Sequence, residues 1–186
     1  MEELRDEQLV SMYLEGDEKS LDILIKRYLK PIYNFLARNT GNNKEAEDLT
    51  QDVFLRVWNN LKKFDTEKVF RTWIYQIARN ASIDYLRKKK ALIFSDLDTE
   101  DRQFSESLAD ESEPVSDRLN REEAGMELAE NLQKLSLDDR TVLLLHYNED
   151  LTFREIADVL NEPMDTVKSR HRRALLKLKK FFKEQK

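Results

Sequence analysis

Four polar residues near the C-terminus have side chains and spacing suited to hydrogen bonding with nucleic acid: Lys168, Ser169, Arg172 and Arg173. Arginine can bind guanine through two hydrogen bonds, lysine acts as a less directional charge, and serine can bond a base or a phosphate. At the helical repeat these residues share one face. They indicate a DNA-binding surface, but composition alone is equally compatible with a solvated amphipathic helix.

The sequence around these residues is typical of two short helices joined by a tight break. Thr152 and Glu155 fit a capping box at the start of the first helix. Pro163 disfavours helical backbone at the residue before it, and Asp165 or Thr166 can cap the second helix. The pattern predicts a helix-turn-helix whose second helix enters the major groove. Phosphate binding is expected from the lysines that follow: Lys177, Lys179, Lys180 and Lys183.

Composition excludes several classes of protein. The chain of 186 residues has 37 % charged residues, 3 Gly and 3 Pro, which favours helices over sheets. It has no cysteine, and its two histidines alone cannot form a metal site. With no signal peptide or membrane span in the sequence, the expected location is the cytoplasm. We find no catalytic set or phosphate loop, and therefore expect no enzyme, no cofactor and no small-molecule substrate.

The charge distribution divides the chain into three parts. The net charge is -5, but residues 91–119 alone hold 9 acidic and 2 basic residues. This stretch cannot bury enough apolar surface to offset the entropy of ordering, so a flexible linker is predicted over residues 91–118. The expected fold is all-α: one small helical domain in residues 1–90 and a second, containing the helix-turn-helix, in residues 119–186.

Hydrophobic periodicity predicts the helices of both domains. In the first domain they lie near residues 6–15, 20–39, 44–64 and 70–89. In the second, helices near residues 118–134 and 137–148 precede the helix-turn-helix. Pro31 lies inside the second helix and is expected to kink it.

Three segments together resemble the extracytoplasmic function (ECF) sigma factors, the two-domain members of the sigma family of bacterial RNA polymerase. They read AEDLTQDVFLRVW (46–58), FRTWIYQIARNASIDYLRKKK (70–90) and TFREIADVLNEPMDTVKSRHRRA (152–174). The resemblance covers nearly the whole chain outside the linker. It implies a protein that binds core RNA polymerase, recognises and melts specific promoters and directs transcription initiation. It also implies an anti-sigma factor as a regulatory partner.

Residues 1–90 resemble sigma domain 2, which implies two sites. Contacts with core polymerase are expected from residues off the buried stripe of 46–58: Glu47, Asp48, Gln51, Asp52, Leu55 and Arg56. Contacts with the melted non-template strand of the minus-ten element are expected from Lys68, Phe70, Arg71, Arg79, Asn80, Arg87 and Lys88.

The residue types of 64–90 agree with the second of these sites. Aromatic side chains alternate there with cations, and single-stranded DNA is bound by stacking of bases on aromatics beside cations that hold the backbone. Capture of an unpaired base stabilises the melted strand. We expect the loop 65–70 to shape the pocket and Asn80 to bond a base edge, whereas Trp73 is expected in the core.

Residues 119–186 resemble sigma domain 4, which binds duplex DNA at the minus-thirty-five element. The implied contacts are Arg154, Thr166, Lys168, Ser169, Arg172, Arg173 and Lys177. The chain departs from the family pattern at Asp165, where glycine is usual, and at His171, where an apolar residue is usual. Both changes bear on the preferred DNA sequence rather than on the fold.

Two other functions fit parts of the sequence. A helix-turn-helix regulator that acts on duplex DNA without polymerase accounts for residues 152–186, but not for the aromatic and basic segment 64–90. A protein–protein adaptor is the third possible function, and it requires no DNA binding. DNA binding whose affinity does not depend on salt would support it. A regulator binds promoter duplex alone, whereas a sigma factor needs core polymerase for tight promoter binding.

Overall fold

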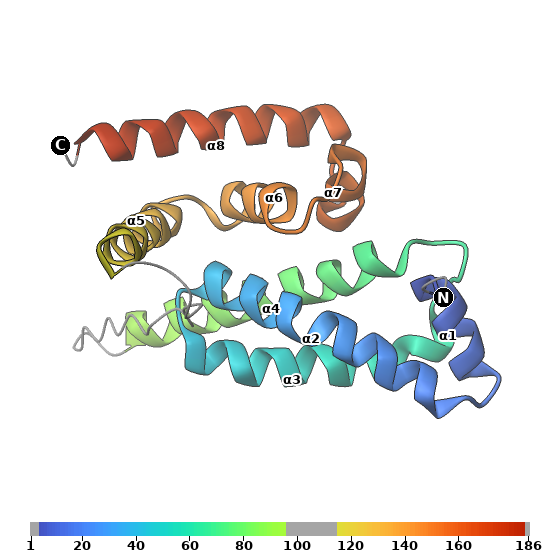
Figure 1. The fold of residues 1–186 in the computed structure, drawn as a ribbon. Helices are drawn as coiled ribbons and strands as arrows, with labels where there is room; N and C mark the ends of the chain where they lie inside the picture. The colour runs from blue at the N-terminus through green and yellow to red at the C-terminus, as the bar shows by residue number, and fades with distance from the viewer. Residues whose placement is uncertain (1–3, 96–114, 185–186) are drawn as a thin grey trace.

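The computed structural model describes residues 4–95 and 115–184, although for residues 92–95 and 115–123 only the backbone. Helices are the regular secondary structure of these ranges, and no strand occurs in them, as the all-α prediction required (Figure 1). The N-terminal unit comprises α1 (Asp6–Leu14), α2 (Glu18–Thr40), α3 (Asn43–Asn60), the 3-10 turn η1 (Leu61–Lys63) and α4 (Phe70–Ser95). The C-terminal unit comprises α5 (Val115–Gln133), α6 (Leu137–Tyr147), α7 (Phe153–Leu160) and α8 (Met164–Glu184).

The N-terminal unit is a bundle in which α2 packs against α1, α3 and α4. Asp17 caps α2 by accepting a hydrogen bond of 3.2 Å from the backbone N–H of Lys19. The helix runs through Pro31 without interruption and ends at Gly41, whose φ of 68° is the left-handed value that favours glycine. Ile32 and Phe35 of this helix are fully buried in the core.

The C-terminal unit contains the predicted helix-turn-helix, formed by α7 and α8. Thr152 and Glu155 form the expected capping box: the Thr152 hydroxyl accepts from the Glu155 N–H at 3.3 Å, and the Glu155 carboxylate accepts from the Thr152 N–H at 2.8 Å. Asn161 ends α7 in the left-handed region, with φ 53°, and α8 begins two residues beyond Glu162. The break therefore combines a left-handed cap with Pro163.

Helices extend into both ends of the predicted linker. The helix α4 continues to Ser95, and α5 begins at Val115, so the prediction that residues 91–118 lack helix is wrong at both margins. The lysines 88–90 allow α4 to continue because lysine loses little side-chain freedom in a helix. The rest of the predicted linker, residues 96–114, lies outside the described residues.

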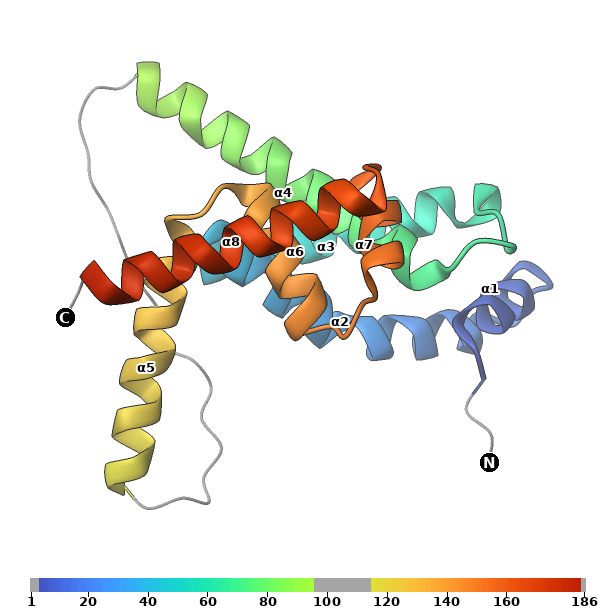
Figure 2. The same cartoon turned by 90° about the horizontal axis from the view of Figure 1, so that it is seen from above.

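The two units pack against each other. The helix α4 contacts α7, and α2 contacts both α5 and α6. Figures 1 and 2 show α6 and α7 lying between the N-terminal bundle and α8, which forms the outer layer of the C-terminal unit. The buried apolar side chains of both units belong to one cluster.

Candidate nucleic-acid and polymerase interfaces

The predicted base-reading residues lie on the outward face of α8. Lys168, Ser169, Arg172 and Arg173 are all exposed, whereas Val167, Ala174 and Leu178 face inward and are buried. Figure 1 shows α8 on the side of the molecule away from α3, so its outer face is open to a partner. Arg154 is also exposed and Thr166 is half-buried. The helix-turn-helix thus presents a cationic N-terminal half of α8, the part that enters a major groove.

Two of these cations already have carboxylate partners. Lys168 lies 3.6 Å from Asp165 one turn earlier, an exposed pair that contributes little to stability. Lys177 donates to the buried Asp139 at 2.6 Å, and Arg170 lies 3.5 Å from the same carboxylate. Burial alone would raise the pKa of Asp139, but the hydrogen bond and charge of Lys177 hold it below its usual value. Lys177 therefore ties α8 to α6, in addition to any phosphate contact.

His171 lies in a small aromatic cluster rather than on the DNA-facing side. Its ring packs edge-on against His146 at 5.1 Å and against Phe153 at 5.2 Å, and its Nε2 is 3.1 Å from the Tyr147 hydroxyl. Burial and the nearby His146 lower the pKa of His171. The residue is thus a half-buried, hydrogen-bonded histidine that joins α8 to α6 and α7.

A pocket of about 370 Å³ opens beside the start of α4, where the sequence predicted a base-binding site. Its walls come from the end of α3, the loop after η1 and one face of α4, and combine aromatic, cationic and amide groups: Arg56, Asn60, Lys63, Phe64, Asp65, Lys68, Trp73, Ile77 and Asn80. The rings of Phe64 and Trp73 pack with centroids 4.8 Å apart. Lys68 and Asn80, both predicted DNA contacts, are brought together here.

Phe70, also predicted to contact DNA, lies in the core instead. Its side chain is 1 % exposed and packs against Tyr28, Phe64 and Trp73 with ring centroids 5.5 to 5.7 Å apart. A fully buried ring cannot stack on a base, so this prediction is corrected. Phe70 supports the rings at the pocket from behind, because α4 begins there and points its first side chain into the bundle. Tyr75, another aromatic of the segment, is buried as well.

Arg71 and Arg79 face the C-terminal unit. Arg71 donates to the backbone oxygen of Glu149, and Arg79 forms a salt bridge of 2.7 Å with Asp138 at the start of α6. The Tyr75 hydroxyl donates to the Glu149 carboxylate, and burial raises the pKa of Glu149 despite this bond. These two predicted DNA contacts are therefore occupied by the other unit in this structure.

The end of α4 projects beyond the bundle, as Figure 2 shows. Arg87 and Lys88, predicted to bind the minus-ten region, are exposed on this projecting part. Arg87 pairs at 3.1 Å with Asp84, which also lies 3.8 Å from Arg56. Asp84 thus positions two arginines.

The predicted polymerase contacts form an open face on α3. Glu47, Asp48 and Gln51 are exposed, and Leu55 is 54 % exposed beside them. Asp52 and Arg56 pair with each other at 2.7 Å on the same surface. Arg56 also lines the pocket, so α3 connects the two candidate sites. Figure 1 shows α3 on the side of the molecule opposite α8.

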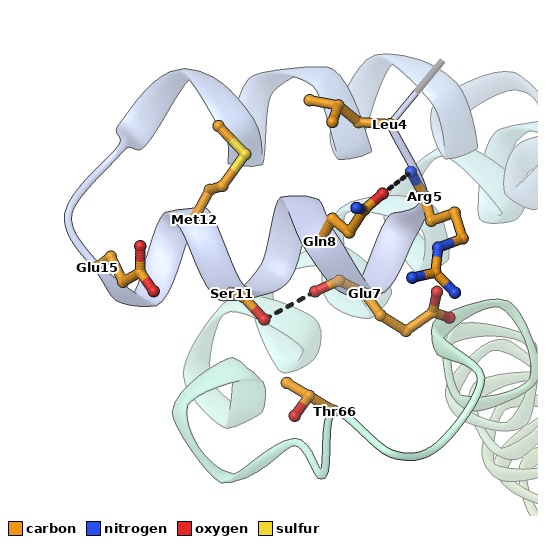
Figure 3. Close-up of a pocket in the computed structure, with 8 residues that line it drawn as sticks. All are labelled: Leu4, Arg5, Glu7, Gln8, Ser11, Met12, Glu15 and Thr66. Carbon is orange, nitrogen blue, oxygen red and sulfur yellow. Dashed lines mark hydrogen bonds between the residues drawn. The ribbon is translucent and has the colours of Figure 1, made fainter. Parts of the chain in front are cut away.

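A second hollow of about 410 Å³ lies between α1 and the loop before α4 (Figure 3). It is lined by Leu4, Arg5, Glu7, Gln8, Ser11, Met12, Glu15 and Thr66. Two of its hydrogen bonds are local, from the Arg5 N–H to Gln8 at 2.9 Å and from the Ser11 hydroxyl to the Glu7 backbone oxygen at 3.0 Å. The Glu7 carboxylate accepts from the Phe70 N–H at 3.0 Å and so is already paired. Nothing in it converges on a ligand, and it has no counterpart among the predicted sites.

Sequence reasoning missed Arg140, Gln133 and Glu149, which join the two units. Arg140 is 5 % exposed and donates to the Asn39 backbone oxygen at 2.6 Å and to the Gln133 side chain. No carboxylate contacts it among the described residues, and burial lowers the pKa of Arg140 to about 10. The sequence did contain one sign that Arg140 is buried: it directly precedes the apolar run TVLLL of α6.

The described ranges, residues 4–95 and 115–184, also lack two features. No trio of His, Cys, Asp or Glu side chains there is arranged to hold a metal ion. No helix in those ranges is long and apolar enough to cross a membrane.

The chain has two small helical units, one with a base-sized pocket and one with a helix-turn-helix. This combination defines a promoter-binding class of protein, and comparison with known proteins agrees. The family described as Sigma-70 region 2 matches residues 24–92, and Sigma-70, region 4 matches residues 131–180. The chain is 34 % identical to the ECF RNA polymerase sigma factor SigW of Bacillus subtilis, across 98 % of this chain and 99 % of that protein. It is 33 % identical to the RNA polymerase sigma-H factor of Pseudomonas aeruginosa, across 91 % and 90 %.

The chain therefore belongs to the ECF sigma factors, and it directs transcription initiation by RNA polymerase. The fold is also that of solved relatives. CnrH, in complex with the cytosolic domain of CnrY, matches with a TM-score of 0.70 at 24 % identity, covering 97 % of this chain and 99 % of that one. RpoE from Bartonella quintana, in complex with the anti-sigma factor NepR, matches with a TM-score of 0.69 at 22 % identity, covering 89 % and 98 %.

Proposed function

We propose that this sigma factor traps an unpaired minus-ten base in the pocket beside α4, while α8 reads the minus-thirty-five duplex and α3 holds core polymerase. The pocket is the observation that carries the proposal. Its volume of about 370 Å³ accommodates a nucleobase, and it places aromatic rings, cations and amides around one opening. Bases stack on aromatic faces, and cations hold the phosphates on either side.

Separate groups in the pocket serve separate parts of a nucleotide. The amides of Asn60 and Asn80 can hydrogen-bond a base edge, because an amide both donates and accepts. Lys63 and Lys68 at the rim balance phosphate charge. Because paired bases cannot enter, the pocket binds only melted DNA. Its binding energy therefore shifts the promoter toward the open state.

The helix-turn-helix supplies sequence-specific binding to duplex DNA. In the proposed complex Arg172 and Arg173 contact base edges from the first turns of α8, with Lys168 and Ser169 beside them. Arg154 of α7 contacts a phosphate, and Thr166 and Lys177 lie at the margins of the same surface. Lys177 must share its charge with Asp139, at 2.6 Å, which reduces its contribution to DNA affinity.

The α3 face is the proposed docking site for core polymerase. Exposed Leu55 provides an apolar contact, and Glu47, Asp48 and Gln51 surround it with polar groups. In this proposal the chain makes and breaks no covalent bond; the chemistry belongs to the polymerase. The proposed location is the cytoplasm.

An anti-sigma factor is the proposed regulator. The two solved relatives of similar fold are both described as complexes, one with the cytosolic domain of CnrY and one with the anti-sigma factor NepR. A partner of that kind would cover surfaces that the polymerase or promoter needs.

Run-off transcription on a promoter library tests the proposed function. Core RNA polymerase is supplied with and without this protein, and sequence-specific start sites that depend on the protein are the expected result. Binding of promoter duplex without polymerase, and no dependent transcript, would instead support a helix-turn-helix regulator. Leu55→Ala should lower transcription while leaving duplex binding by the free chain unchanged, with the exposed Ile23→Ala on α2 as the control.

A further inference from the structure

Asp165 is an acidic residue on the face of α8 that carries the proposed contacts with duplex DNA. The helix begins at Met164, so Asp165 and Thr166 lie inside its first turn rather than at the cap position that the sequence predicted. The Asp165 side chain is 92 % exposed. At the helical repeat it shares one stripe of α8 with Ser169 and Arg172, four and seven residues later. A carboxylate therefore lies in line with the proposed base-reading groups.

The chemistry of the major groove limits what this carboxylate can bind. An ionised carboxylate only accepts hydrogen bonds, and the phosphates of both strands repel it. Guanine O6 and N7 and thymine O4 are also acceptors. Adenine offers its N6 amino group but places the N7 acceptor beside it, whereas the cytosine N4 amino group has no acceptor of the same base next to it in this groove. Cytosine is therefore the best partner for Asp165.

Lys168 places a donor beside this acceptor. Its Nζ lies 3.6 Å from the Asp165 Oδ1, and its side chain is 48 % exposed. The major-groove edge of a G·C pair presents the complementary arrangement, with the acceptors O6 and N7 on guanine and the donor N4 on cytosine. Guanine O6 and cytosine N4 are hydrogen-bonded to each other and so lie about 3 Å apart. The two side-chain groups are separated by a similar distance, so one ion pair matches one base pair.

Helix stability alone does not account for the position of Asp165. An acidic residue in the first turn interacts favourably with the helix dipole on any side of the helix, and an exposed ion pair one turn apart contributes little. Neither effect requires the carboxylate to be in line with Arg172. On that face it lowers the affinity for phosphate, because it removes one unit of positive charge from the surface. A hydrogen bond to a base edge offsets this loss at the correct sequence only.

We infer that Asp165 and Lys168 together recognise one G·C pair of the minus-thirty-five element. Asp165 accepts from cytosine N4, and Lys168 donates to guanine O6 or N7. The inference rests on the proposed function, because it places the start of α8 in the major groove. Arg172 contacts a different base pair, since it lies seven residues, about 10 Å, farther along the helix than Asp165. Asp165 thereby restricts this sigma factor to promoters with cytosine at one position.

The base preference of Asp165 variants tests the inference. The full chain with core polymerase transcribes a promoter library randomised over the minus-thirty-five element, and transcript counts give the preference at each position. Wild type should prefer one G·C pair, and its preference for that cytosine should fall about tenfold in Asp165→Ala. Asp165→Asn should change the preferred base at the same position from cytosine to adenine, because an amide bonds adenine N6 and N7 together. Asp158→Asn, at an exposed aspartate of α7, is the matched control and should keep the wild-type preference.

Lys168→Ala in the same library supplies the second readout. It should relax the preference at the base pair that Asp165→Ala relaxes, whereas Arg172→Ala should relax a different one. A purely structural role of Asp165 would lower transcription from all promoters alike and leave the order of preferred sequences unchanged. Circular dichroism confirms that each variant is folded.

Three results overturn the inference: an unchanged base preference in both Asp165 variants, no preferred G·C pair in wild type, or relaxation of different base pairs by Asp165→Ala and Lys168→Ala. The proposed function fails separately, and selection of randomised duplex DNA by the full chain at low salt, without polymerase, shows the difference. If no promoter-dependent transcript appears but the selected duplexes change from cytosine to adenine in Asp165→Asn, the base contact is retained and its role at promoters is lost. Promoter-dependent transcription with the same preference in every Asp165 variant would do the reverse.

Discussion

Single residues of α8 should set the minus-thirty-five preference. We expect Arg172→Ala to relax specificity at about one base pair, by ~1–3 kcal/mol, because an exposed arginine at this position can bind a guanine through two bonds. The measurement is run-off transcription on a randomised minus-thirty-five library. Lys179→Ala, in a later turn, should weaken all sequences alike and reduce the salt dependence. An unchanged preference in Arg172→Ala would show that a different register of α8 contacts the bases.

His171 should make the stability of the C-terminal unit depend on pH. Its pKa in the folded chain is lower than the value of 6.5 expected when unfolded, because of burial and the nearby His146. The unfolded chain therefore binds the proton more tightly, and stability falls as the pH drops below 6.5. His171→Gln should show a smaller drop in melting temperature between about pH 7.5 and pH 5.5 than wild type. Equal drops would exclude His171 as the source.

At the scale of elements, the capping box should determine how well α7 forms. Thr152→Ala removes the hydroxyl that accepts from the Glu155 N–H, and an eight-residue helix has few other bonds to compensate. We expect a loss of about 0.5–2 kcal/mol in the free energy of unfolding. Urea unfolding followed by circular dichroism measures it. Thr66→Ala, an exposed threonine outside the helices, serves as the control and should have little effect.

The pocket at the start of α4 should act on melted DNA only. Asn80→Ala removes an amide from its wall, and loss of one hydrogen bond of about 0.5–1.5 kcal/mol should reduce open-complex formation roughly two- to tenfold. Fluorescence of a base analogue in the minus-ten element, with core polymerase present, reports opening. Asn59→Ala, exposed on α3 outside the pocket, is the matched change. If binding to minus-thirty-five duplex fell equally, the effect would be on folding instead.

At the scale of the whole molecule, acid should favour packing of the two units against each other. Burial at the boundary raises the pKa of Glu149 above its ordinary value of 4.5; the hydrogen bond from Tyr75 and the charges of Arg71 and Arg38 lower it, and Asp150 raises it. The packed arrangement thus binds a proton more tightly than separated units, so packing strengthens as the pH falls from above the raised pKa toward 4.5. Energy transfer between fluorescent labels on α2 and α8 should show a growing short-distance population over that range. Glu149→Gln removes the titrating group and should flatten this response, and an identical response in that variant would contradict the assignment.

The helices and the class of protein could be predicted from the sequence because their signals are local. A capping box spans four residues, and an apolar stripe repeats within two turns. The helix-turn-helix residues 152–174 therefore appear where expected, with Lys168, Ser169, Arg172 and Arg173 exposed. The roles assigned to individual site residues remain predictions. For the linker, composition was a poor guide at its margins, since α4 and α5 extend into it.

The exposure of a side chain could not be predicted from its residue type. Phe70 and Trp73 lie in the same aromatic and basic segment, yet Phe70 is 1 % exposed while Trp73 lines the pocket. The difference depends on which side of α4 faces α2 at each position, and that is set by packing of helices remote in sequence. Both residues are aromatic and could stack on bases. Only the packing of the bundle decides which ring a base can contact.

The sequence by itself therefore determined the helices, the two-part plan and the family, since each rests on interactions within a few residues or on motifs in a given order. Only the tertiary structure decided the pairing of Arg79 with Asp138 and of Arg140 with the end of α2, residues separated by 59 and 101 positions. Such contacts form where two surfaces meet, and no local pattern specifies their register. The packing of the two units belongs to that long-range level.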